Sequence, residues 1–124
     1  MFDHISFGVR DIARSKAFYD AALEPLGFKR LSESDYSLGY GKEAVKLWIG
    51  ATNFPVADDP RSGLHFCFVA PDRASVVRFH AAALAAGGRD NGKPGIRAEH
   101  DVGYFAAYVV DPDGYRLEVL HRGA

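Results

Sequence analysis

The sequence predicts an α+β fold made of two tandem βαβββ modules within one domain, residues 1–124. A length of 124 residues suits a single domain, because domains commonly contain about 100–150 residues. An internal repeat supports the two modules, since residues 4–27 align with residues 65–88 when the chain is shifted along itself. The identical positions are three alanine pairs and His4/His65, Phe7/Phe68, Asp11/Asp72, Phe18/Phe79, Leu23/Leu84 and Gly27/Gly88. We expect the first module at about 1–50, a surface linker at about 51–63 and the second module at about 64–124.

Each module begins with a β-prone run and continues into a helix. The first strands are expected at 2–9 and 64–69, and Asp11 and Asp72 are the expected N-caps of the helices that follow. Prolines and glycines near residues 25–27 and 87–88 end these helices. Three further strands are expected in each module, at 28–33, 36–41 and 44–49, and at about 90–98, 104–110 and 115–121.

Composition and charge exclude several classes of protein. With 48% apolar and 25% charged residues, the chain matches ordinary globular proteins rather than disordered ones. Its 15 basic and 16 acidic side chains form no block that would attract nucleic acid or anionic lipid. We expect no membrane segment and no signal peptide. The single Cys67 cannot form an intrachain disulfide, so we expect a cytoplasmic protein. Because the charges are balanced, we expect its partners to be a small molecule and a second copy of itself.

Strand alternation places two histidines and a carboxylate where they could bind a metal ion. His4 and Ser6 share one side of the first strand, and the repeat makes His65 the equivalent of His4. Glu118 lies in an apolar strand, facing away from the helices, and a buried glutamate is costly unless it is paired or bound to metal. We interpret His4, His65 and Glu118 as ligands of a divalent metal (Fe, Mn, Co, Ni or Zn) with open coordination positions. The alternative is that the histidines only hydrogen-bond neighbours at the edge of the core.

Three segments carry a family resemblance that covers essentially the whole chain. They are DHISFGVRDIARSKAFYDAALEPLGF (3–28), GLHFCF (63–68) and YVVDPDGYRLEVL (108–120), and they resemble the vicinal oxygen chelate superfamily. This superfamily contains glyoxalase I, fosfomycin-modifying thiol transferases, extradiol dioxygenases and bleomycin-resistance proteins. The resemblance implies paired βαβββ modules that form an incomplete barrel around a metal, with His4, His65 and Glu118 at the ligand positions.

The resemblance also implies a function and leaves an alternative. It implies a metalloenzyme that chelates adjacent oxygens of a small substrate for lyase, isomerase, transferase or ring-cleavage chemistry. The alternative is a non-catalytic protein that sequesters a small molecule, as bleomycin-resistance relatives do. Aligning KLWIG with RLEVL places Trp48 where glyoxalase I has a further glutamate ligand, so the catalytic base must be another group.

The remaining site candidates line the same predicted cavity. Tyr108 is the first candidate for proton transfer and His100 the second. The substrate-binding candidates are Ser6, Lys46, Trp48 and Arg97. Single-domain members of this family commonly dimerise, so a homodimer is expected, with metal ligands that come from one chain or are shared between two.

Overall fold

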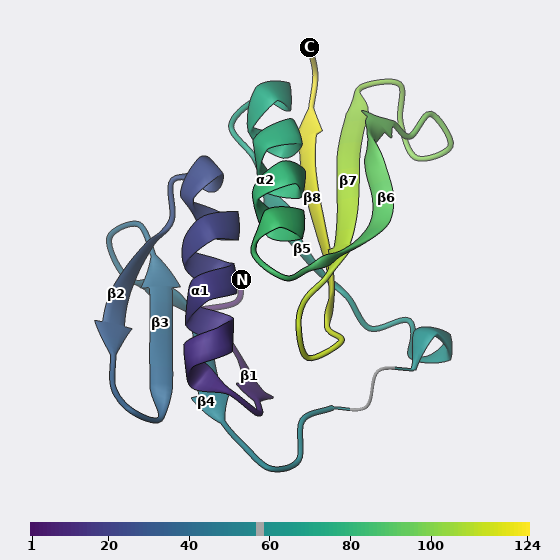
Figure 1. The fold of residues 1–124 in the computed structure, drawn as a ribbon. Coiled ribbons are helices and arrows are strands. Elements are labelled where there is room, and N and C mark those ends of the chain that lie inside the picture. The colour runs from purple at the N-terminus through teal and green to yellow at the C-terminus, as the bar shows by residue number, and fades with distance from the viewer. Residues whose placement is uncertain (57–58) are drawn as a thin grey trace.

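The computed structural model describes residues 1–56 and 59–124, and it contains two four-stranded sheets, each covered on one face by a helix (Figure 1). The first module contains β1 (Ile5–Val9), α1 (Ile12–Leu23), the short 3₁₀ helix η1 (Glu24–Leu26), β2 (Lys29–Glu33), β3 (Ser37–Gly41) and β4 (Val45–Ala51). After a second 3₁₀ helix, η2 (Pro60–Ser62), the second module contains β5 (Phe66–Val69), α2 (Arg73–Ala85), β6 (Arg89–Ile96), β7 (Tyr104–Val110) and β8 (Arg116–Arg122). The predicted fold class is therefore confirmed, and the two modules do not close into a barrel.

The two sheets have the same topology, as the internal repeat requires. Their strand orders are β1-β4-β3-β2 and β5-β8-β7-β6, with the first strand of each module parallel to the last and the other pairings antiparallel. Ser6 pairs in register with Trp48, and Cys67 pairs with Glu118. Trp48 thus occupies in the first sheet the position that Glu118 occupies in the second.

Both helices begin at the predicted N-caps. The Asp11 carboxylate accepts a hydrogen bond from the Arg14 N–H, and the Asp72 carboxylate accepts one from the Ser75 N–H. These bonds satisfy amides that the first helical turn leaves without an intrahelical partner. At the other end of α1, η1 leads to Gly27, whose φ of 82° is a left-handed conformation that glycine adopts without steric cost.

Some boundaries differ from those predicted. The strands expected from residues 2 and 64 begin at Ile5 and Phe66, so His4 and His65 lie just before β1 and β5. The expected linker at 51–63 contains the last residue of β4 and the helix η2, and its residues 57–58 lie outside the described part of the chain. Three-residue helices of this kind have too little periodicity to be read from a sequence.

One apolar core joins the modules. The helices α1 and α2 pack side by side between the two sheets, as Figure 1 shows. The Phe7 ring of β1 lies 4.4 Å from the Tyr115 ring and 5.4 Å from the Phe66 ring, measured between centroids. In the described part of the chain, no helix combines the length and the apolar character needed to cross a bilayer.

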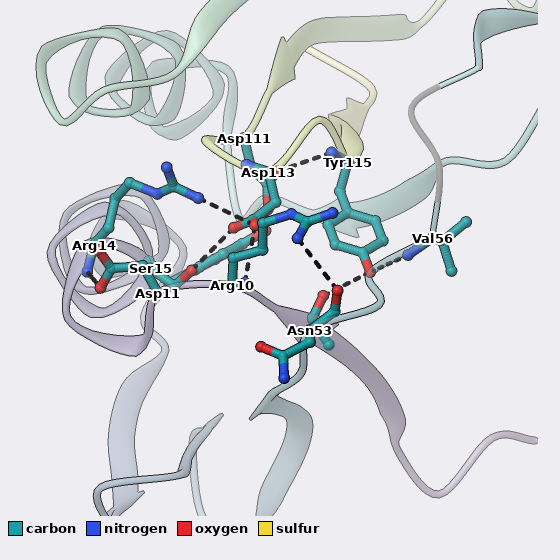
Figure 2. Close-up of polar contacts among 11 residues, drawn as sticks. Arg10, Asp11, Arg14, Ser15, Asn53, Val56, Asp111, Asp113 and Tyr115 are labelled. Carbon is teal, nitrogen blue, oxygen red and sulfur yellow. Dashed lines mark hydrogen bonds and ion pairs between the residues drawn. The ribbon is translucent and has the colours of Figure 1, made fainter.

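The turn between β7 and β8 ties the second module to the start of α1 (Figure 2). The Asp113 carboxylate accepts hydrogen bonds from the Arg10 N–H at 3.0 Å and from the Ser15 hydroxyl at 3.5 Å, and it forms an ion pair with Arg14 at 3.1 Å. The Tyr115 hydroxyl donates to the Gly8 carbonyl at 2.7 Å. We call this set of contacts the intermodule latch.

Candidate metal and substrate site

Glu118 is the centre of the candidate site. It lies in the middle of β8, where only 4% of its surface is exposed. Its Oε1 atom is 3.0 Å from Nε2 of His65, whose side chain is 48% exposed. A buried carboxylate needs partners to offset its lost hydration, and a half-exposed imidazole beside it provides one that solvent and small molecules can reach.

Two tyrosines of β7 donate hydrogen bonds to the other oxygen of the same carboxylate. Tyr108, directly opposite Glu118 in the β7–β8 ladder, donates to Oε2 at 3.2 Å, and Tyr104 donates to Oε2 as well. Burial, together with the nearby Glu118 carboxylate, raises the pKa of both phenols. A raised phenol pKa favours the protonated form, so both tyrosines are hydrogen-bond donors at neutral pH.

The segment between β6 and β7 carries two further predicted residues to this site. The Arg97 guanidinium lies 5.4 Å from the centroid of the Tyr108 ring and donates to the Lys93 carbonyl. The exposed His100 ring lies 4.9 Å from the Tyr104 ring, centroid to centroid. Arg97 and His100 therefore lie beside the tyrosine pair.

Cys67 lies beside Glu118 on the neighbouring strand β5. Cys67 is exposed in this chain, yet neighbouring atoms desolvate its thiol and, with the negative charge of Glu118, raise the thiol pKa to about 12. A thiol in this state is protonated at neutral pH and is a poor nucleophile. Cys67 therefore contributes a small side chain to the site rather than a reactive thiolate.

The predicted residues of the first module lie apart from this cluster. His4 precedes β1, where its Nδ1 lies 2.6 Å from the Asp3 carboxylate. Ser6 and Trp48 are register partners that line a shallow depression on the first sheet, and Lys46 is exposed on β4. The structure thus assembles the predicted residues into two groups, one on each module.

The side chains of His65 and Glu118 are chemically suited to bind a transition-metal ion, but within the described chain they are only two of the three predicted ligands. Histidine nitrogen and glutamate oxygen are ordinary ligands of such ions, and His65 and Glu118 already converge. Across residues 1–56 and 59–124, however, the structure brings no three His, Cys, Asp or Glu side chains together as a metal site.

A cavity of about 430 Å³ separates the start of β1 from β5. Its walls are mainly apolar, and His4 and Lys46 border it. Glu118 does not line it, but its register partner Cys67 does, so the cavity adjoins the Glu118 cluster. The Glu118 cluster differs from the cavity because several hydrogen-bonding groups converge there on one buried carboxylate.

Sequence reasoning missed Tyr104. The signal was present, because Tyr104, Ala106 and Tyr108 alternate along β7 and alternate residues of a strand share a face. A phenol hydroxyl needs a partner when it is buried, and this requirement points to a polar contact for Tyr104.

The fold and the cluster define a class of protein: paired βαβββ modules with a histidine–glutamate site on the sheets. The family model described as "Glyoxalase/Bleomycin resistance protein/Dioxygenase superfamily" matches residues 1–119. The chain belongs to this superfamily.

Individual relatives agree with that assignment. A lactoylglutathione lyase of Arabidopsis thaliana is 32% identical over 133 residues, covering 98% of this chain and 44% of the relative. The chain therefore spans less than half the length of that curated relative. A crystal structure of a glyoxalase/bleomycin resistance protein from Albidiferax ferrireducens T118 is 33% identical, with a TM-score of 0.87 over 98% of this chain and 99% of that one. A family enzyme from Burkholderia phytofirmans PsJN, at 16% identity and a TM-score of 0.73, shares the fold over 98% of both chains.

Proposed function

We propose that the protein is a metal-dependent enzyme that acts on a small substrate with adjacent oxygen atoms. His65 and Glu118 of one copy and His4 of a second copy would hold the divalent metal. One observation supports this most strongly: the buried Glu118 carboxylate directs one oxygen at a half-exposed histidine. The superfamily membership adds to that support.

The surrounding residues have separate roles in this proposal. The bound metal supplies Lewis-acid stabilisation of negative charge on substrate oxygens. Tyr108 donates a hydrogen bond beside that charge, and Arg97 adds positive charge next to the Tyr108 ring. Trp48 and Lys46 form a wall on the first module of the second copy.

The reaction class we propose is that of a lyase acting on the thiol adduct of a 2-oxoaldehyde. A lactoylglutathione lyase is among the relatives, which makes this adduct the first substrate to test. Trp48 stands where a second carboxylate would lie, so His100 or Tyr108 must carry any proton transfer. Tyr108 donates a hydrogen bond to Glu118, and the His100 ring lies beside the Tyr104 ring.

Metal analysis tests this proposal directly. We expect the protein purified without chelator to bind one divalent ion per chain, and His65→Ala to weaken its affinity by more than about 100-fold. Loss of a ligand should exceed the roughly 10–100-fold cost of losing an outer contact. His121→Ala, which removes a histidine that contacts the Ala70 carbonyl, is the matched control. Wild-type affinity in His65→Ala, or turnover of the adduct after complete metal removal, would overturn the proposal.

The same proposal requires a homodimer with shared sites. The edge strands β1 and β5 each pair with one strand only in the described chain, and such edges are commonly covered by another chain. We expect a dimer by analytical ultracentrifugation, with two sites that each combine His4 of one copy with His65 of the other.

Mixing two inactive variants tests the sharing. His4→Ala and His65→Ala homodimers each lack both sites, but their heterodimer has one intact site. With random exchange of subunits, about a quarter of the sites should return, because half of the dimers are heterodimers and each has one of two sites. A monomer at micromolar concentration, or no recovery after unfolding and refolding the mixture, would exclude shared sites.

A further inference from the structure

The hydrogen bonds around Glu118 divide its two oxygens unequally. Tyr104 and Tyr108 both donate to Oε2, while Oε1 faces His65 and has no tyrosine partner. Tyr108 reaches Oε2 from directly across the β7–β8 ladder, and Tyr104 reaches it diagonally, from four residues earlier on β7. Two separate donors therefore hold Oε2, while Oε1 faces His65 and has no such donor.

We propose that Tyr104 is a positioning residue that, together with Tyr108, restricts Glu118 to binding a metal through Oε1 alone. This inference rests on the metal site proposed above. A carboxylate that binds through both oxygens must turn both toward the ion. Here such a turn would take Oε2 away from two hydroxyl donors in a buried site, where unmade hydrogen bonds are costly.

Contacts on the ring of Tyr104 keep its hydroxyl in place. The Arg122 guanidinium lies 5.4 Å from the ring centroid, and the His100 ring lies 4.9 Å away. Arg122 is also the register partner of Tyr104 across the ladder. Arg122 on β8 and His100 before β7 therefore limit the positions that the phenol can take.

A one-oxygen glutamate has a consequence for which ion binds and how much room remains. It uses one coordination position instead of two, which leaves an additional position for a substrate that binds through two oxygens. It also disfavours Ca²⁺, which takes six to eight oxygen ligands and often a bidentate carboxylate. The site should therefore select small transition-metal ions over Ca²⁺, beyond the preference set by the histidines.

Binding of Co²⁺ alone provides the test, because its visible absorption reports coordination number and geometry. We expect Tyr104→Phe to weaken Co²⁺ binding by about 10–100-fold, the usual effect of losing an outer-shell contact. We also expect its Co²⁺ spectrum to shift toward higher coordination and its Co²⁺/Ca²⁺ selectivity to fall. Tyr108→Phe should change affinity in the same direction.

Tyr40→Phe is the matched control. Its hydroxyl donates to the Asp20 carboxylate at 2.8 Å, away from the site, so the variant also loses a tyrosine–carboxylate bond. It should keep the wild-type Co²⁺ affinity and spectrum even if its unfolding temperature falls. If the unaltered protein binds Co²⁺ and Tyr104→Phe matches it in affinity and spectrum, this inference is wrong and the metal site stands. If the unaltered protein binds no divalent ion, both proposals are overturned.

Discussion

Two aspartates at repeated positions show how a single side chain defines the start of a helix. Asp72 accepts hydrogen bonds at 2.7 Å from both the N–H and the hydroxyl of Ser75. The side-chain bond, followed by the backbone bond, holds the pKa of Asp72 below its usual range. A carboxyl whose pKa is lower in the folded state stabilises the fold above the unfolded pKa of about 3.8, and that contribution is lost as pH falls through the folded value.

We therefore expect the N-cap of α2 to contribute stability that depends on pH in the acidic range. Asp72→Ala should lower the free energy of unfolding at pH 7, and its deficit relative to wild type should shrink below about pH 3.8. Asp72→Asn, which keeps an oxygen acceptor without a titrating group, should be less destabilised and should lose this pH dependence. Urea unfolding at pH 7 and at about pH 3 measures both effects. A deficit of equal size at the two pH values would contradict the assignment.

In the second sheet, the close approach of β6 to Tyr108 depends on a glycine, Gly92. Gly92 in β6 has a φ of 156°, which side chains rarely adopt, and a Cβ there would lie 2.8 Å from Cδ2 of Tyr108. The β6–β7 register also shifts at this residue. The absence of a side chain at residue 92 thus allows β6 to lie against the tyrosine that faces Glu118.

We expect Gly92→Ala to destabilise the protein by about 1–3 kcal/mol, since it combines backbone strain with a clash. It should also displace Tyr108 and so weaken metal binding. Gly50→Ala is the control, because a Cβ at residue 50 would meet only the Tyr36 carbonyl, at 4.0 Å. Chemical denaturation and Co²⁺ titration of both variants measure the effects. If Gly92→Ala and Gly50→Ala were equally stable, the close approach would have no energetic importance.

The order and type of the helices and strands could be predicted from the sequence, but the residues where the strands begin could not. Helix starts followed from Asp11 and Asp72, since N-capping depends on residues close in sequence. The starts of β1 and β5 could not be placed, because a strand ends where its partner ends, and this depends on distant residues. The bulge at Gly92 was invisible for the same reason.

For the whole molecule, the intermodule latch determines how the two halves meet. The side chain of Asp113 is 1% exposed, and its carboxylate accepts a hydrogen bond from the Arg10 N–H, just before α1. We expect Asp113→Ala to lower the free energy of unfolding by about 1–3 kcal/mol, because it removes the acceptor of the buried Ser15 hydroxyl and of the Arg10 N–H, and the ion pair with Arg14. Asp35→Ala, at an exposed turn position, should be neutral. Thermal and urea unfolding compare the two, and an Asp113→Ala variant as stable as wild type would show that the latch does not hold the modules.

The site could be predicted only within each module. The sequence predicted that His65, Glu118 and Tyr108 lie on the second module, and the structure has Glu118 in contact with both His65 and Tyr108. The position of His4 relative to them depends on how α1 and α2 pack and on which copy of the chain supplies the first module. Local sequence patterns do not contain that information, so the three-ligand site remains a prediction.

The latch also bears on the order in which the chain folds. Its hydrogen bonds join residues that are 98 to 107 positions apart, such as Gly8 and Tyr115. Closing so long a loop costs conformational entropy before any contact can repay it, whereas the hairpins of β2–β4 and β6–β8 close over short loops. Each half should therefore acquire its own sheet first, and the two should dock late. A chain that grew by duplication would thus still fold as two similar units, whose joining is the slow and final event.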